Sequence, residues 1–263
     1  MTNHPQKAVV SGGGSDEFVE PRNCPSHGRY DAPYLQIMST RLYRPCPACT
    51  EELRKQSAAI AAERRHNMRM ASLEQSNVPP RFLSRTLSNF LADTPAQKSA
   101  LNFAKDYAEN WAENFKKGRC VLFVGRPGTG KTHLAVGIMS QILLGHESVS
   151  MRFSTVSSII RRIKESFRKD STEREADVIR SYTRCDLLVI DEVGVQFGTE
   201  FEKNALFEII NDRYEAQKPT ILISNLSPDG VCEYLGERAF DRLHENGGRC
   251  IAFAWESHRR SRQ

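Results

Sequence analysis

The sequence predicts an α/β protein with one parallel five-stranded sheet, preceded by a small metal-binding module and a helical linker. Three observations lead to this prediction. From Arg119 onward, apolar strand-like segments alternate with helical segments, as expected for parallel strands joined by helical crossovers. A glycine-rich segment at residues 125–132 separates one of these strands from the helix that follows it. Closer to the N-terminus, cysteine and histidine residues stand in closely spaced pairs.

The composition restricts the classes of protein that the chain can belong to. Its 263 residues accommodate one large domain and a small one, and the apolar content of 39% is sufficient for a core. No apolar run reaches membrane-spanning length and no export signal is evident, so we expect a cytoplasmic protein without a membrane partner. The seven cysteines are an odd number in such a chain, which argues against a disulfide framework. The net charge of +5 permits nucleic-acid binding without requiring it.

The N-terminal region begins with a tail and continues into a candidate metal site. Residues 1–21 contain a GGGS stretch and little apolar periodicity, so we expect a disordered tail. Residues 22–50 contain the segments CPSHG and CPAC, whose metal-ligating residues are Cys24, His27, Cys46 and Cys49. Two such chelating pairs can surround one tetrahedral Zn²⁺ ion, and four protein ligands make the site structural. The alternative is three free thiols and an unrelated histidine.

Two helices are expected between this module and the sheet. Residues 51–76 contain good helix formers without glycine or proline, and the segment NVPP at residues 77–80 ends them. We expect this helix to be long and exposed, and a domain covering residues 77–263 to follow it. A second helix is predicted between Thr94, a capping residue followed by Pro95, and Gly118.

The glycine-rich segment predicts a phosphate-binding loop. It matches G-x-x-x-x-G-K-[ST] at every fixed position and lies between a strand and a helix, as this motif requires. We expect Lys131 to reach the β- and γ-phosphates of a nucleotide and Thr132 to provide a hydroxyl ligand to Mg²⁺. The residues assigned to nucleotide binding are Gly125, Arg126, Pro127, Gly128, Thr129, Gly130, Lys131, Thr132 and His133. The alternative is a glycine-rich turn without a ligand.

Polar residues end two further predicted strands. The strand in CDLLVIDEVG ends at Asp191 and Glu192; Asp191 can bind Mg²⁺ through water, and Glu192 can orient or deprotonate the attacking water. The strand in PTILISN ends at Asn225, whose amide could hold that water or contact the γ-phosphate. An ordinary helix cap at Asp191 and an ordinary turn at Asn225 are the alternatives. A glutamate directly after the aspartate favours hydrolysis over binding alone.

These motifs together resemble the AAA+ ATPases, with GRPGTGKT, LLVIDE and ILISN as Walker A, Walker B and sensor 1 segments. Residues 77–263 resemble more narrowly the DnaC/DnaI-type replicative helicase loaders of bacteria and phages, most specifically through LGERAFDRL and WESHR. The resemblance implies an AAA+ P-loop NTPase core that uses ATP and Mg²⁺. The IstB-type transposition helper ATPases share much of this core and remain an alternative.

The resemblance also implies roles for three arginines. Arg242 matches the position of the arginine finger, which completes the nucleotide site of a neighbouring subunit, and Arg238 lies one helical turn before it. Arg259 matches the sensor 2 arginine. The alternatives are surface salt bridges for the first two and a solvated basic tail for the third. A finger implies self-association, as a ring or open spiral on the helicase.

A basic segment follows at residues 151–170. We expect Ile159, Ile160, Ile163 and Phe167 to share a buried helix face, with the basic side chains projecting outward. These are Arg152, Arg161, Arg162, Lys164, Arg168 and Lys169. The resemblance implies that the segment contacts single-stranded DNA, and the alternative is a solvated charged face.

The function expected from the sequence is ATP-dependent loading of a hexameric replicative helicase of the DnaB type onto single-stranded DNA. The zinc module matches the DnaI-type loaders and departs from the DnaC pattern, and residues 22–75 are predicted to dock the helicase. One alternative is an IstB-like ATPase that acts on target DNA with a transposase. Another is a zinc adaptor without catalysis, against which the intact Lys131, Asp191 and Glu192 argue.

Overall fold

The computed structural model describes residues 18–146, 148–195 and 199–257, and the chain divides into two compact units at His66 and Asn67. Most of the predicted tail lies outside the described residues. The last four residues of the tail, from Phe18 to Pro21, instead belong to a strand, so the predicted boundary at residue 21 is wrong. Among the described residues, no helix has the length and apolar character needed to cross a membrane.

The first unit contains an antiparallel sheet in the order β1-β2-β3, formed by Phe18–Cys24, Gly28–Ile37 and Thr40–Tyr43. Aromatic side chains hold one face of this sheet together. The ring of Tyr34 lies 5.6 Å from that of Phe18 and 5.2 Å from that of Tyr43. The Tyr43 hydroxyl donates to Glu20 at 2.5 Å. These cross-strand pairs stabilise a sheet that is too small for an apolar core.

Helix α1 spans Pro47–Gln75, so it begins four residues before the predicted helix and ends one residue before its predicted end. Its last turns belong to the second unit, because Leu73 is fully buried there and Met70 packs against the same core. The Ser76 carbonyl then accepts a hydrogen bond from the Phe153 amide at 2.7 Å. The second unit therefore begins inside the helix rather than at Asn77, because apolar residues near the helix end pack on the sheet domain.

The second unit is built on the predicted five-stranded parallel sheet, which the structure confirms. Its order is β5-β6-β7-β4-β8, and every neighbouring pair is parallel. The strands are β4 (Val121–Gly125), β5 (Met151–Thr155), β6 (Leu187–Val193), β7 (Thr220–Ser224) and β8 (Arg249–Phe253). Phe123 packs into the core on one face and Leu122 into the core on the other, as the alternation of a strand requires.

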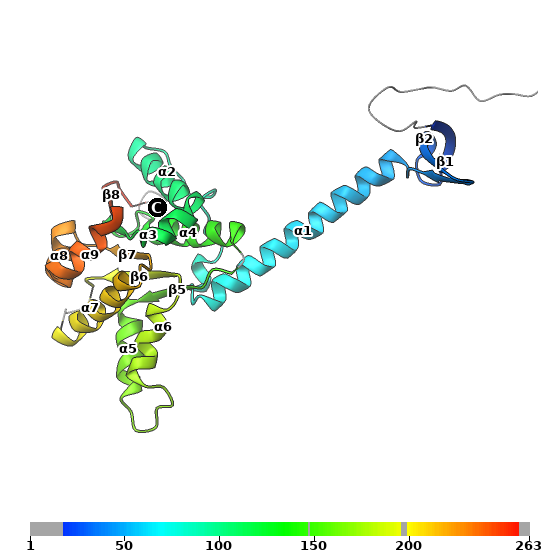
Figure 1. Ribbon diagram of the computed structural model, residues 1–263. Coiled ribbons are helices and arrows are strands. Elements are labelled where there is room, and N and C mark those ends of the chain that lie inside the picture. Colours follow the sequence, from blue (N-terminus) through cyan, green and yellow to red (C-terminus); the bar gives the residue numbers. More distant parts are fainter. Residues whose placement is uncertain (1–17, 147, 196–198, 258–263) are drawn as a thin grey trace, which may run out of the picture. The chain divides into compact units, whose positions relative to one another are not determined.

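Helices cover both faces of this sheet (Figure 1). On one face lie α2 (Pro95–Glu109), α3 (Trp111–Lys117) and α4 (Lys131–Gly145). On the other lie α5 (Val156–Ser166), α6 (Glu175–Thr183), α7 (Glu200–Glu215), α8 (Pro228–Leu235) and α9 (Glu237–His244). Two short 3₁₀ helices, η1 (Pro80–Phe82) and η2 (Glu245–Gly247), complete the unit.

The helix predicted after Thr94 begins and ends as expected but is interrupted. Thr94 forms a capping box with Gln97, and Gly118 ends the second half in the left-handed conformation. Between them, Asn110 separates α2 from α3, and its side-chain amide donates to the Asp106 carbonyl at 3.0 Å. An asparagine that binds the backbone in this way competes with the helical hydrogen bond. The single predicted helix is therefore two.

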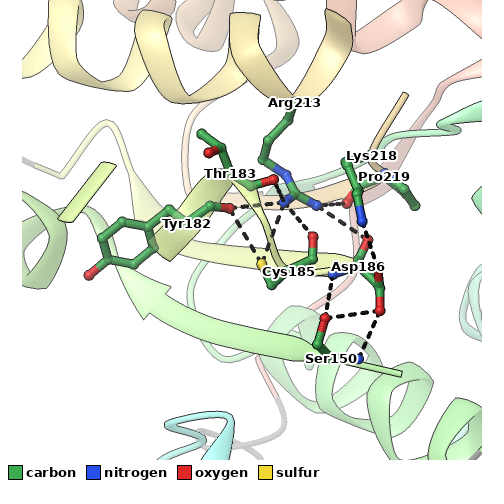
Figure 2. A network of polar contacts seen from close by, with 8 residues as sticks. All are labelled: Ser150, Tyr182, Thr183, Cys185, Asp186, Arg213, Lys218 and Pro219. Carbon is green, nitrogen blue, oxygen red and sulfur yellow. Dashed lines mark hydrogen bonds and ion pairs between the residues drawn. The ribbon is translucent and has the colours of Figure 1, made fainter. Parts of the chain in front are cut away.

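A buried arginine ties the amino-terminal ends of β6 and β7 to α7 (Figure 2). The Arg213 side chain is 1% exposed. Its guanidinium donates to the carbonyls of Tyr182, Cys185 and Pro219 at 2.9, 2.8 and 2.5 Å, and to the Thr220 hydroxyl at 2.8 Å. No carboxylate contacts this charge among the described residues, so neutral acceptors, mainly backbone carbonyls, compensate for its lost hydration.

Replacing Arg213 with methionine is expected to destabilise the second unit by about 3–5 kcal/mol, because several buried carbonyls would lose their donor. Urea unfolding followed by circular dichroism measures this difference. Arg180→Met removes an exposed arginine that pairs with Asp177 and is expected to cost less than about 0.5 kcal/mol. A loss below about 1 kcal/mol for Arg213→Met would contradict the structural role of the network.

Candidate nucleotide and metal sites

A cavity of about 650 Å³ lies at the carboxyl ends of the central strands of the second unit. Strand β4 lies between β7 and β8, while the chain that leaves it crosses to β5 at the far edge of the sheet. Ligands bind in open α/β sheets at such points. The residues lining the cavity are Arg81, Phe82, Arg85, Asn89, Phe90, Leu91, Pro127, Gly128, Gly130, Lys131, Thr132, His133, Asp191, Glu192, Ile223 and Asn225.

The glycine-rich loop of the cavity needs its glycines for close backbone approach. A side chain at Gly125 (φ +133°) would place its Cβ 2.4 Å from the Phe253 carbonyl oxygen, and one at Gly130 (φ +98°) would meet the Phe90 ring at 2.6 Å. Thr129 is buried, and its carbonyl accepts from the indole of Trp255 at 2.9 Å. Contacts within the chain therefore hold the loop in place. Gly125, Arg126 and Thr129 shape it without lining the cavity.

Lys131 is the first residue of α4 and points back into the loop. Its ammonium donates to the carbonyls of Gly125 and Arg126 at 2.6 and 2.8 Å. Burial lowers the pKa of Lys131 to about 8, although the nearby Asp191 opposes this shift. A buried ammonium at a helix N-terminus is well placed to bind an anion.

The carboxylates after β6 lie beside this lysine. The Thr132 hydroxyl donates to Asp191 at 2.8 Å. Burial raises the pKa of Asp191, although this hydrogen bond acts to lower it. The pairing of β6 with β7 shifts register between Ile190 and Val193, so a bulge releases Asp191 and Glu192 from that ladder. Adjacent hydroxyl and carboxylate oxygens are the donors that Mg²⁺ prefers.

Glu192 has a left-handed backbone conformation, with φ +62°. This conformation is strained for a residue with a side chain, and it is held by a hydrogen bond of 2.7 Å from the Glu192 amide to Asp191. Asn225 follows β7 and also lines the cavity. The structure therefore brings the predicted lysine, threonine, carboxylates and asparagine to one place.

The wall of the cavity formed by residues 81–91 is not predicted from the sequence. His133, predicted only as a nucleotide contact, joins α4 to this wall: its Nε2 lies 2.9 Å from both the Thr86 carbonyl and the Asn89 side chain. Its ring also meets that of Phe90 edge-on at 5.2 Å. The sequence of this wall has no helical or strand periodicity. Its aromatic residues, Phe82 and Phe90, are the sequence signal that could have pointed to a binding surface.

The predicted zinc ligands converge in the first unit. The ligand atoms of Cys24, His27, Cys46 and Cys49 all lie within 4.8 Å of one another. The sulfurs of Cys24 and Cys49 are 3.4 Å apart, and the His27 Nδ1 lies 3.2–3.8 Å from the three sulfurs. A tetrahedral zinc ion needs about 3.8 Å between two sulfurs and about 3.6 Å between sulfur and nitrogen. The four residues therefore fit zinc.

Their local structure explains the convergence. Cys24 and His27 flank the tight turn from β1 to β2, and Cys46 and Cys49 stand at the beginning of α1. The pKa of Cys24 is lowered to about 6, mainly because its sulfur accepts a hydrogen bond from the backbone amide of Ser26. This lowered pKa favours the thiolate, the form that metals bind. The His27 Nε2 lies 3.0 Å from Glu52, a partner that the sequence analysis missed. That carboxylate leaves Nδ1 as the ligand atom.

Comparison with known proteins identifies the family. Residues 52–242 match the model of the IstB-like ATP binding proteins, which is most of the chain. The chain belongs to the IstB-like ATP-binding protein family. The match includes the whole cavity and begins after the four zinc ligands, so the metal cluster lies outside the part shared with the family.

Individual relatives of this family member are similar over part of the chain. The replicative helicase loader DnaC of Escherichia coli is 36% identical over 138 residues, which are 52% of this chain and 55% of that protein. The match thus spans about half the length of these curated relatives. The crystal structure of the DnaC helicase loader matches with a TM-score of 0.59 and 23% identity over 66% of this chain and 99% of the other. The crystal structure of DnaI matches with a TM-score of 0.56 and 19% identity over 68% of this chain and 93% of the other. These structures confirm the AAA+ fold.

The arginines assigned from the family resemblance lie elsewhere. Arg238 is exposed and Arg242 half-buried on α9, and neither lines the cavity. The Arg242 guanidinium lies 5.3 Å from the ring centroids of both Phe207 and Tyr214. Its Nη1 is buried without a hydrogen-bond partner among the described residues. Arg259 falls outside the part of the chain that the structure describes.

The basic segment differs from its prediction in two respects. Phe167 is 54% exposed rather than buried, because α5 ends at Ser166 and the chain leaves the core there. Arg162 pairs with Glu173 through its Nε at 3.0 Å, and Arg152 and Arg162 both donate to the Ser181 hydroxyl, at 3.1 and 2.9 Å. The basic residues that remain exposed are Arg161, Lys164, Arg168 and Lys169.

Proposed function

We propose that this protein binds and hydrolyses ATP·Mg²⁺ and uses the cycle to load a hexameric replicative helicase onto single-stranded DNA. One observation carries the ATPase part: the cavity combines a fixed phosphate loop and Lys131 with the Thr132–Asp191 pair and the strained Glu192. The helicase part rests on the 36% identity to the DnaC loader over half of each chain.

Each residue of the cavity has a chemical role in this proposal. Loop amides and Lys131 hold the phosphates, while Thr132 and Asp191 hold Mg²⁺, with Asp191 acting through water. When bound, the ion neutralises charge on the phosphate oxygens. Glu192 orients the attacking water and accepts its proton. Asn225 holds the same water against the terminal phosphate.

The affinity for ATP is expected to fall as the pH rises above about 8. The pKa of Lys131 is lowered to about 8 in the nucleotide-free cavity, and only the protonated form carries a charge to the phosphates. Binding is thus strongest below this pKa and weakens by up to about tenfold for each further pH unit, until the pKa of the complex is reached. Titration with a fluorescent ATP analogue from pH 6.5 to 10 measures the effect. Lys131→Met is expected to bind weakly at every pH, and an unchanged pH profile in this variant would contradict the assignment.

Self-association forms part of the proposal. Arg242 acts as a finger on the nucleotide of a neighbouring copy, with Arg238 beside it. Neither arginine lines the cavity of its own chain, which agrees with this role. Arg259 contacts the nucleotide in its own chain. The copies form a ring or open spiral on the helicase, and the exposed basic residues from Arg161 to Lys169 contact single-stranded DNA.

The first unit provides the docking surface for the helicase in this proposal. Zinc, held by the four ligands, fixes the small sheet and the start of α1 in one arrangement. The docking surface would then lie in residues 22–75, which the family match overlaps from residue 52 onward.

A reconstituted loading assay tests the proposal. Single-stranded DNA circles coated with single-strand-binding protein exclude a hexameric helicase of the DnaB type, and unwinding of an annealed strand reports loading. We expect unwinding only when the full chain and ATP are both present, and at most a trace with Lys131→Met. Absence of loading, together with absence of binding to the hexamer in a pulldown, would sink the helicase proposal.

The family match supports a second candidate function. The family is described as ATP-binding, and the alternative drawn from the sequence is an ATPase that prepares target DNA for a transposase. It would prefer duplex over single-stranded DNA in a binding titration. Retention of a transposase rather than a helicase from a bacterial lysate would favour this candidate.

A further inference from the structure

A cluster of polar side chains beside the edge strand β5 has no role in the function proposed above. Helices α5 and α6 lie side by side next to it (Figure 1). Arg152 of β5 and Arg162 of α5 both donate to the hydroxyl of Ser181 on α6, at 3.1 and 2.9 Å. That hydroxyl donates in turn to the Val178 carbonyl at 2.6 Å, which leaves its lone pairs to the arginines. Three elements thus bring two cations to one point.

An aromatic ring holds the two guanidinium groups in place. Both lie over the ring of Tyr182, Arg152 at 5.1 Å and Arg162 at 5.7 Å from its centroid. Tyr182 is only 3% exposed, and its carbonyl accepts from the buried Arg213 at 2.9 Å (Figure 2). The cations are therefore positioned by the core of the second unit, so less conformational entropy is lost when a ligand binds to them.

One carboxylate faces the two cations. Glu173, in the loop between α5 and α6, accepts from the Nε of Arg162 at 3.0 Å and from its Nη2 at 2.5 Å. All three nitrogens of the Arg162 guanidinium are then in use. Within the described part of the chain, Arg152 forms no ion pair and donates only through its Nη1. The cluster keeps one excess positive charge, and two cations held together favour a further anion.

The fork between Arg162 and Glu173 has the geometry in which a guanidinium binds a phosphate. A phosphate presents two oxygens to the same two donors and has a third oxygen for Arg152. The side chains of Arg162 and Glu173 are 31% and 38% exposed, and an ion pair of this exposure contributes little to stability. Ser171 holds the Glu173 amide and carbonyl at 3.2 and 2.9 Å, so only the carboxylate has to move in an exchange.

The place of the cluster on α5 points to a nucleic-acid phosphate. Arg162 follows Arg161, the first of the exposed basic residues that extend to Lys169. A polyanion that contacts these exposed residues also meets the cluster, because both belong to the same helix. A single small anion contacts only one of the two groups, and it gains less from the release of counterions.

We propose that Arg152 and Arg162 bind one phosphate of single-stranded DNA in exchange for the carboxylate of Glu173. The proposal rests on the DNA contact proposed above, and it adds two half-buried arginines and an internal competitor to that contact. Glu173 then lowers the affinity for DNA, and the two arginines fix the position of one phosphate. The ion pair between Arg162 and Glu173 is a mimic of the bound ligand rather than only a brace between two helices.

Titration of a fluorescently labelled oligothymidylate with variants of the full chain, followed by anisotropy, tests the proposal. Glu173→Gln keeps the size of the side chain but removes the competing charge, so the affinity is expected to rise by about three- to tenfold. Arg152→Ala is expected to weaken binding by about five- to tenfold. It should also lower the slope of log affinity against log salt by about 0.7, the value for one phosphate of a single strand. Arg152→Lys keeps the charge and should keep this slope.

Matched controls separate the site from general charge effects. Glu175→Gln removes the same charge two residues later, from an exposed position on α6. Arg180→Ala removes an exposed arginine of α6 that pairs with Asp177. Each should change the affinity by less than about twofold, because the charge is screened by solvent. In an Arg162→Ala background, Glu173→Gln should lose most of its gain, since the two residues act on the same phosphate.

The sign of the Glu173→Gln effect decides the outcome, because partial unfolding cannot raise the affinity. An unchanged or weaker affinity would leave the ion pair as a brace and overturn the proposal, as would an equal gain in Glu175→Gln. If the unaltered chain does not bind the oligonucleotide, the proposed DNA contact fails first and this inference with it. Binding by the unaltered chain that none of these variants changes would reject the inference alone.

Calorimetric titration with inorganic phosphate distinguishes a strand from a free ion. We expect phosphate to bind too weakly to compete with the oligonucleotide at equal ionic strength. An affinity for inorganic phosphate that changes in Arg152→Ala and Glu173→Gln, while oligonucleotide binding stays constant, would assign the cluster to a free anion and overturn its assignment to DNA.

Discussion

Removal of zinc is expected to unfold the first unit while the sheet domain stays folded. Among the described residues up to His66, only Cys24, Ala32 and Cys46 are buried, and two of these three are candidate metal ligands. The unit therefore has almost no apolar core apart from its metal site. Zinc binding contributes on the order of 10 kcal/mol of folding free energy in small domains that depend on it, which is more than this sheet could otherwise supply.

Chelation followed by hydrogen exchange separates the two units. We expect amides of β1–β3 to lose protection after treatment with a chelator, and amides of β4 and β6 to keep it. Cys49→Ser should reproduce the loss, and zinc content measured by metal analysis should fall with it. Cys232→Ser provides the matched control, because Cys232 lies on α8, far along the chain from the cluster. Full protection of β1–β3 in the metal-free protein would rule out zinc as the structural support.

The same experiment bears on function. The nucleotide cavity lies entirely within the second unit, so its affinity for ATP should be unchanged by chelation. Helicase binding should be lost if the first unit is the docking surface. A loss of both properties would instead indicate that the metal supports the whole chain.

The sheet and the phosphate loop could be predicted because their determinants are local. Strands β4, β6 and β7 are short apolar runs, and each leads into residues that line the cavity, so pattern and spacing suffice. The convergence of the four candidate zinc ligands was predictable for a similar reason, since each pair occupies one tight turn or one helical turn. Sequence spacing describes such features completely.

Features that depend on distant contacts could not be predicted in this way. Arg81 enters the cavity only because its wall packs on α4, some fifty residues later in the chain. The Arg242 guanidinium lies against Phe207 and Tyr214 of α7, whereas the alternative given from the sequence was a surface salt bridge. Phe167 followed the spacing of a buried helix face, but α5 ends one residue before it. In each case tertiary packing decided the outcome, and periodicity carries no information about it.

Replacing Glu192 with glutamine is expected to lower ATP hydrolysis by about 100- to 1,000-fold and to change ATP affinity by less than about threefold. The amide keeps the size of the side chain but cannot accept a proton from water. Lys131, Thr132 and Asp191, which are assigned to the phosphates and the metal, are unaltered. Phosphate release under single-turnover conditions measures the rate, and Glu200→Gln, an exposed glutamate on α7, serves as the control.

A second variant separates catalysis from folding at the same position. Glu192 adopts φ +62°, which costs a residue with a side chain about 1 kcal/mol or more and costs glycine almost nothing. Glu192→Gly is therefore expected to be as inactive as the glutamine variant and yet to match or exceed the unaltered chain in resistance to urea. A strained residue that weakens the fold and is needed for the reaction is one retained for its chemistry. If Glu192→Gly were instead both less stable and still active, Glu192 would be a structural residue of the bulge, and the base would have to be sought elsewhere in the cavity.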